Sequence, residues 1–293
     1  MFRIESPQIP HGCRQLAFLF AMLCLTTICG CGSEVYEKRL DETVKYYTYL
    51  EKVNNAVDAN PFVGDGLSIR VPKKFELIPK KPRRPKKKSD EETEDGEEEE
   101  PRDSRQPDYM DVELPGLEAA WKTTVGVPLD NKNVQRPVYL YAMSNAARWR
   151  RFKKEEAKDP KELHNDLAMV LGEELDMIEF LQDAKNYSTI EVPNPDETRY
   201  AVPKKYTTIT LTPKERTIND VETEFHIYLY SEGDAFAALL LVIPLNANPT
   251  DRFVERMKIA LHTMDAYKPN VTALPNAPGA DNQGAPQNQG GSF

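Results

Sequence analysis

The feature that most constrains the fold is an unbroken run of nine apolar residues at positions 235–243. A strand that is apolar at every position must be covered on both faces, whereas a strand with one solvated face alternates between apolar and polar residues. The preceding segment, residues 221–230, alternates in this way. Residues 231–234 between the two have the composition of a hairpin turn, in which Gly233 can adopt a positive φ. We therefore expect an antiparallel hairpin whose second strand lies at the centre of a sheet.

Similar patterns recur along the chain. Runs typical of strands lie at residues 67–71, 75–78, 117–127, 136–143 and 206–212. Apolar residues at three- and four-residue steps predict helices at residues 33–59, from about Ser144, at 159–181 and at 253–264. Asp159 is the expected N-cap of the third helix, and residues 248–251 are expected to cap the fourth. Together these elements predict a single α+β domain, a mostly antiparallel sheet flanked by helices in an α/β/α sandwich.

Two stretches have a composition that cannot form a core. Residues 79–108 contain no apolar side chain, and a block of basic residues and proline at 80–88 precedes an almost wholly acidic block at 89–100. Burial cannot offset the ordering entropy of such a segment, so we expect a disordered insert at 79–108 and a disordered tail at 269–293. The basic block alone would suggest nuclear import or nucleic acid. Beside the acidic block, we expect it to fold back electrostatically or to contact anionic head groups.

The cysteines are confined to the N-terminus. All four lie within the first 31 residues, so the chain after Cys31 can form neither an internal disulfide nor a thiolate metal site. Its stability must come from the core alone. The formal net charge is −9, which repels DNA and RNA overall, so nucleic acid is not an expected partner.

The N-terminus is typical of a secretory signal peptide. Arg14 is followed by a largely apolar run at residues 16–28. At about 1.5 Å per helical residue this run spans roughly 20 Å, which is well short of a hydrocarbon core of about 30 Å. The pattern predicts a signal peptide at residues 1–30 rather than a transmembrane helix.

The residues that follow, Ile28-Cys29-Gly30-Cys31, resemble the lipobox of bacterial lipoproteins, with an aliphatic residue three positions before the cysteine and small residues between. The resemblance implies that Cys31 receives a diacylglycerol, that the chain is cleaved ahead of it, and that the new amine is usually acylated, for example with palmitate. Cys29 fits less well, because Ile28 would then occupy a position that demands a small residue. Departures from the pattern are Cys at the second position and a long first region containing Glu5. An ordinary cleaved signal peptide and an uncleaved anchor are the alternatives.

The resemblance also implies an extracytoplasmic location on a bacterial membrane. A triacyl group, at about 0.8 kcal/mol per buried methylene, holds a protein nearly permanently. Gly32 and Ser33 follow the cysteine. Where sorting resembles the enterobacterial pattern, an Asp directly after the cysteine retains the protein in the inner membrane, so its absence favours the outer membrane.

The first segment after the signal peptide, residues 31–60, reads as a helix that ends at Asn60-Pro61. Its apolar residues recur at helical spacing: Tyr36, Leu40, Val44, Tyr47, Leu50 and Val57. We expect this helix to dock on the α+β domain at residues 61–268. A stalk or a coiled-coil strand is the alternative.

Parts of this domain resemble PsbP-like domains. Residues 67–75 have the order strand, Val71-Pro72, short gap and aromatic Phe75, and residues 221–266 match the closing hairpin, Pro-capped helix and final aromatic. The resemblance covers about a third of the chain. It implies a non-enzymatic assembly or binding protein of an exported or lumenal compartment.

A candidate metal site lies on the strand at residues 221–230. Glu222, Glu224 and His226 share one face of this strand, and alternate residues lie about 7 Å apart, so these side chains could converge on zinc or a non-haem metal. The same pattern is typical of the solvated or helix-covered side of any amphipathic strand. The latter interpretation predicts no metal and no cofactor.

A second candidate is a cationic segment with interleaved aromatics. Its residues are Arg148, Trp149, Arg150, Arg151 and Phe152, followed by two lysines. This composition is typical of a contact with anionic lipid. Alternatively, Trp149 and Phe152 anchor a helix to the core while the cations stay in water.

The function expected from these features is a lipid-anchored, non-catalytic binding or assembly module with a protein partner. Motifs of phosphate loops, zincins and serine hydrolases do not occur in the sequence. The alternatives are a metal-dependent enzyme that uses the strand with His226, and a sensor of anionic membrane surfaces that uses the cationic segment.

Overall fold

The central sheet is built from strands that pair antiparallel throughout, in the order β3-β4-β5-β10-β9-β7-β6, with β8 paired to β9. The computed structural model describes residues 33–81, 102–129, 132–151, 159–194, 198–213, 217–218, 220–247 and 251–268. The strands are β3 (Glu76–Leu77), β4 (Leu117–Leu129), β5 (Lys132–Ser144), β6 (Ser188–Val192), β7 (Lys204–Leu211), β8 (Thr217–Ile218), β9 (Val221–Glu232) and β10 (Ala235–Pro244).

Strand β10 lies at the centre of this sheet, between β5 and β9. Leu239 pairs with Ala142 of β5 on one side and with Tyr228 of β9 on the other. Its apolar side chains are buried on both faces, except for the half-buried Phe236. The prediction of a central, doubly covered strand is therefore confirmed.

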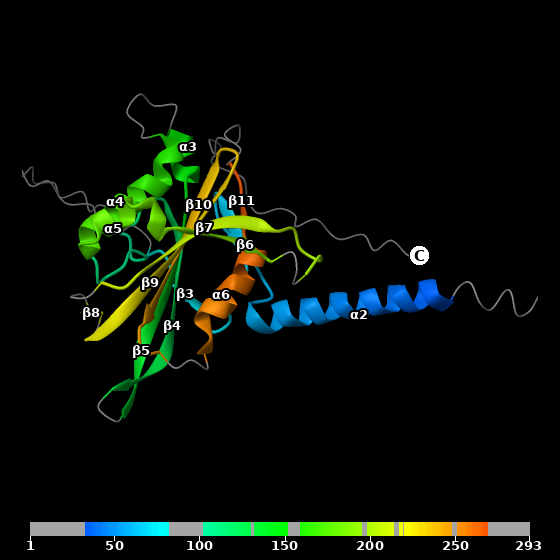
Figure 1. Ribbon diagram of the computed structural model, residues 1–293. Coiled ribbons are helices and arrows are strands. Elements are labelled where there is room, and N and C mark those ends of the chain that lie inside the picture. Colours follow the sequence, from blue (N-terminus) through cyan, green and yellow to red (C-terminus); the bar gives the residue numbers. More distant parts are fainter. Residues whose placement is uncertain are drawn as a thin grey trace, which may run out of the picture.

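Helices cover both faces of the sheet. Helices α4 (Leu163–Leu175) and α5 (Ile178–Gln182) lie on one face with α3 (Ala146–Arg151) at its end, and α6 (Phe253–His262) lies on the other (Figure 1). The core accordingly forms two clusters, one containing Leu167 and Leu171 of α4 and the other containing Met257 and Leu261 of α6. The predicted α+β sandwich is confirmed.

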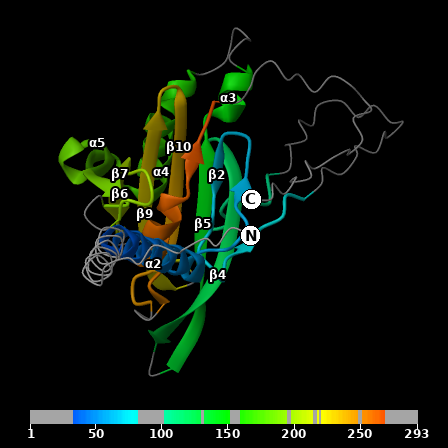
Figure 2. The same ribbon diagram turned by 90° about the vertical axis from the view of Figure 1, so that its right-hand side faces the viewer.

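A smaller three-stranded sheet lies beside the α6 face. It has the order β1 (Phe62–Val63), β2 (Leu67–Ile69) and β11 (Asp265–Ala266), all antiparallel. Strand β11 directly follows α6 and pairs with β2, so a segment near the end of the described chain lies beside one near its beginning. Figure 2 shows α6 and α2 on the same side of the large sheet.

Helix α2 (Ser33–Ala56) is packed into the core only in its last turns, so the expected docking on the domain holds for part of the helix. Val53 and Ala56 are buried, but Tyr36 and Tyr47 on its apolar stripe are 67 % and 64 % exposed. At about 1.5 Å per residue α2 is roughly 36 Å long, whereas α6 beneath it spans only about 15 Å. The first turns of α2 therefore extend beyond the domain, as Figure 1 shows.

Local details differ from the sequence-based expectations in three places. The helix expected at 159–181 breaks at Asp176, which adopts a left-handed conformation and donates its N–H to carbonyls of the preceding turn. Strands β1, β6, β8 and β11 were not predicted. Residues 248–250 of the expected cap of the last helix lie outside the described residues, and α6 itself starts after Arg252, which has φ 46° and provides no side-chain cap. Asp159 does accept a hydrogen bond from the N–H of Lys161, as predicted, although the first turn is a 3₁₀-helix.

The predicted signal peptide, Cys31, the tail at 269–293 and most of the predicted insert lie outside the described residues. Within the insert, residues 79–81 and 102–108 are described, and at these positions the prediction of disorder is wrong. The hydroxyl of Ser104 donates to the Pro79 carbonyl at 3.0 Å, and Arg105 donates to the Glu118 carbonyl. Such hydrogen bonds replace the apolar burial that the sequence lacks.

Over the ranges that the structure describes, no helix has the length and apolar character needed to cross a membrane.

Candidate ligand-binding groove

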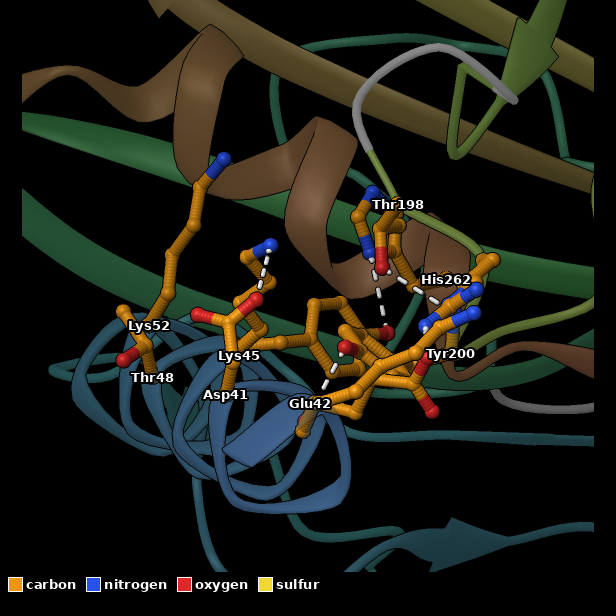
Figure 3. A pocket seen from close by; sticks show the side chains of 11 residues that line it. Asp41, Glu42, Lys45, Thr48, Lys52, Thr198, Tyr200 and His262 are labelled. Atoms are coloured by element: carbon orange, nitrogen blue, oxygen red, sulfur yellow. Dashed lines mark hydrogen bonds and ion pairs between the residues drawn. The ribbon is translucent and has the colours of Figure 1, made fainter. Parts of the chain in front are cut away.

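A groove of about 710 Å³ runs along α2 where this helix leaves the domain (Figure 3). Its other wall is formed by residues 198–200 and by the C-terminal end of α6. We call it the α2 groove. The residues that line it are Lys38, Asp41, Glu42, Lys45, Thr48, Tyr49, Lys52, Thr198, Arg199, Tyr200 and His262.

Three lysines of the α2 groove repeat at seven-residue intervals. Lys38, Lys45 and Lys52 therefore lie on one side of α2, since seven residues are nearly two helical turns. Lys45 Nζ lies 2.6 Å from Asp41 Oδ2, and this hydrogen bond and charge raise the pKa of Lys45. Within the part of the chain that the structure describes, no ion pair involves Lys38 or Lys52.

The opposite wall is tied to α2 by polar contacts. Arg199 Nη2 lies 2.8 Å from Glu42 Oε1, and its guanidinium lies over the Tyr200 ring at 5.8 Å. The Tyr200 hydroxyl donates to the Glu42 backbone carbonyl at 3.1 Å. These contacts close one side of the groove around the middle of α2.

Aromatic rings form the inner end of the α2 groove. The rings of Tyr49 and His262 are stacked, with an interplanar angle of 9° and centroids 6.1 Å apart, and Tyr200 lies 6.0 Å from Tyr49. Tyr49 Oη lies 3.4 Å from His262 Nδ1. Burial raises the pKa of Tyr49, so the phenol keeps its proton. The groove thus offers apolar ring surface together with hydroxyl groups.

The α2 groove is electropositive within an acidic protein. Four cations against two carboxylates leave a formal charge of +2 among its lining residues, whereas the whole chain carries −9. Because Asp41 and Glu42 each bind one cation internally, the charges of Lys38 and Lys52 remain available to a ligand. Such an arrangement can bind an anion.

The structure does not assemble the predicted metal site. His226 Nε2 lies 3.0 Å from Glu224 Oε2, and Thr210 Oγ1 lies 3.2 Å from His226 Nδ1, so both imidazole nitrogens have protein partners. Glu222 is exposed at the start of the strand. Across the described ranges, no cluster of three or more His, Cys, Asp or Glu side chains could hold a metal ion. Burial, which outweighs the charge of Glu224, lowers the pKa of His226.

Part of the cationic segment contacts the rest of the domain, and the other part is exposed to solvent. Arg148 Nη2 lies 2.6 Å from Asp166 Oδ2, in a pair whose side chains are 14 % and 12 % exposed. Trp149 Nε1 donates to the Asp234 carbonyl at 3.0 Å, so this ring is also held by the domain. Arg150 pairs with an exposed aspartate, Arg151 is exposed, and Phe152 lies outside the described residues.

The sequence-based reasoning missed the α2 groove. The seven-residue repeat of Lys38, Lys45 and Lys52 was a signal for one wall. The other wall comes from residues 198–200 and from His262, which lies 213 positions after Tyr49. No local pattern connects such distant segments.

Comparisons with known proteins assign no family to this chain. No protein-family model and no curated protein matches the chain. A crystal structure from Bacteroides thetaiotaomicron VPI-5482 is similar with a TM-score of 0.32 and 10 % sequence identity, over 73 % of this chain. The chain spans 49 % of that protein's length. At this TM-score the likeness carries no argument about function.

Proposed function

We propose that this chain is a bacterial lipoprotein, anchored through Cys31 outside the cytoplasm, that acts as a non-catalytic binding module. The observation that carries this proposal is the placement of α2. The helix begins two residues after Cys31, extends beyond the domain, and carries the α2 groove on the side that faces the domain. It is therefore suited to hold a binding site at a distance from a membrane.

The contacts around the two predicted sites favour binding over the alternatives. A metal-dependent enzyme would need a third ligand beside Glu224 and His226, and these two residues already bind each other. A membrane-surface sensor would use Arg148 and Trp149, but both are held by contacts within the domain.

Acylation is tested by the mass of the N-terminus after expression of the full chain in bacteria. We expect the wild type to begin at Cys31 and to carry acyl chains, because only Cys31 has an aliphatic residue three positions before it and small residues between. Cys31→Ser should abolish both the acylation and the cleavage. Cys29→Ser is the matched control and should be processed normally. Acyl chains on the Cys31→Ser variant, or an unacylated wild type, would contradict the proposed anchor.

A further inference from the structure

We propose that the α2 groove binds a linear acidic polysaccharide that carries one negative charge per disaccharide. This inference rests on the proposed function, because an extracytoplasmic position exposes the groove to polysaccharides of cell surfaces. The argument starts from the spacing of the lysines on α2.

Seven residues of α-helix rise by about 10.5 Å, so Lys38, Lys45 and Lys52 form a row roughly 21 Å long. A compact anion such as free phosphate can contact only one member of this row. Unit charges about 10 Å apart in water interact only weakly, so the other lysines add little to the binding of such an ion. The row therefore suits an extended ligand with regularly repeated charges. Because Asp41 binds Lys45, the charges available to a ligand are those of Lys38 and Lys52, whose separation along the helix is comparable with the length of two disaccharide units.

The aromatic residues favour a sugar over other polyanions. Tyr49 and Tyr200 are half-buried and line the groove beside the lysines, and contacts with His262 and Arg199 hold their rings in place. A sugar ring has a face of C–H groups and an edge of hydroxyls, so it can pack on an aromatic ring and form hydrogen bonds at the same time. A polyphosphate chain offers no apolar face for these rings.

The shape of the site argues against a lipid bilayer as the ligand. The lysines face a second wall that contains Arg199 and Tyr200, and this wall is joined to α2 through Glu42. A flat membrane surface cannot enter between two walls, whereas a single polymer strand can.

The test uses the full mature chain in detergent micelles and hyaluronan oligosaccharides, which carry one carboxylate per disaccharide. We expect a hexasaccharide to bind measurably in calorimetric titration and a single disaccharide to bind much more weakly, because it reaches only one lysine. Affinity should fall as salt is raised. Lys38→Gln and Lys52→Gln should each weaken binding about two- to fivefold, as expected for exposed charge pairs. Lys38→Arg should retain it.

Arg39→Gln is the matched control, since Arg39 is on the same helix but does not line the groove. Equal weakening by Arg39→Gln, or unchanged binding in both lysine variants, would overturn the proposal. So would a neutral oligosaccharide, a polyphosphate or an anionic vesicle that binds as tightly as the hexasaccharide. Thermal unfolding of each variant checks that the fold is retained.

The two proposals fail independently. If Cys31 is acylated but hyaluronan does not bind, the anchored module stands and the ligand class is wrong. If hyaluronan binding depends on Lys38 and Lys52 but Cys31 carries no lipid, the ligand class stands and the anchor is wrong.

Discussion

At the scale of single residues, the domain contains an ion pair that is largely buried. Arg148 and Asp166 form such a pair between α3 and α4. Removing one partner of a buried ion pair leaves an uncompensated charge, whereas replacing both by apolar residues is often neutral. The pair therefore adds little net stability, but neither of its residues can be replaced alone without a large loss of stability.

We predict that Arg148→Ala lowers the free energy of unfolding by about 3–5 kcal/mol, because the buried carboxylate of Asp166 loses the cation that compensates its charge. Combining Arg148→Met with Asp166→Leu should recover most of this loss. Denaturant titration measures both changes. A loss below about 1 kcal/mol for the single variant would show that the pair behaves as an exposed one.

Glu118 gives a second prediction at this scale. Burial raises the pKa of Glu118 above its usual range, although the Ser144 hydroxyl, which donates to its carboxylate, partly opposes the shift. The folded chain therefore binds this proton more tightly than the unfolded chain. The stability that this group contributes is complete at acidic pH and is lost as pH rises through the raised folded-state pKa.

Glu118→Gln mimics the protonated side chain and should remove the fall in stability that Glu118 causes as pH rises. We expect the variant to be more stable than the wild type near about pH 7, with little difference at pH values below the unfolded-state pKa. Denaturant titrations at the two pH values measure the effect. An equal change in stability at both would mean that ionisation of Glu118 is not the cause.

At the scale of elements, α2 and α6 are both amphipathic but have different roles. Leu40 of α2 is 51 % exposed, whereas Leu261 of α6 is fully buried. Leu261 packs in the same cluster as the last turns of α2, so the two helices meet only at one end. Stability is therefore expected to depend on α6 and on the C-terminal end of α2.

We predict that Leu40→Ala changes the free energy of unfolding by less than about 0.5 kcal/mol, as is usual for a surface position. Leu261→Ala, the matched substitution in α6, should cost about 2–5 kcal/mol through lost burial and a cavity. Thermal or chemical unfolding compares the two. If Leu40→Ala cost as much as Leu261→Ala, α2 would have to be packed along its whole length in solution.

At the scale of the whole molecule, the α2 groove exists only because three distant segments meet. Helix α2 supplies the lysines, the segment before β7 supplies Arg199 and Tyr200, and α6 supplies His262. The position of α6 depends in turn on the sheet, since the Tyr206 hydroxyl of β7 donates to the Leu261 carbonyl at 2.8 Å. The large sheet thus acts as the frame on which a helix near the chain's start meets one near its end.

The sequence by itself determined the layers of this protein. The apolar run at 235–243 and the alternation before it specified a central hairpin, and the helical stripes specified helices on both faces, because hydrophobic periodicity is a local property. The break at Asp176 was not visible in this pattern, since the apolar stripe continues through it. The contact between Thr210 and His226 likewise required the folded strand β9 and its neighbour β7.

Only the tertiary structure decided how far α2 docks and that a groove forms beside it. The stripe of α2 is equally apolar in its buried and exposed halves, and the length of α6 sets where burial stops. The walls of the groove are separated by 213 positions between Tyr49 and His262. Contacts across such separations leave no trace in local spacing, because they depend on where a completed sheet places its helices.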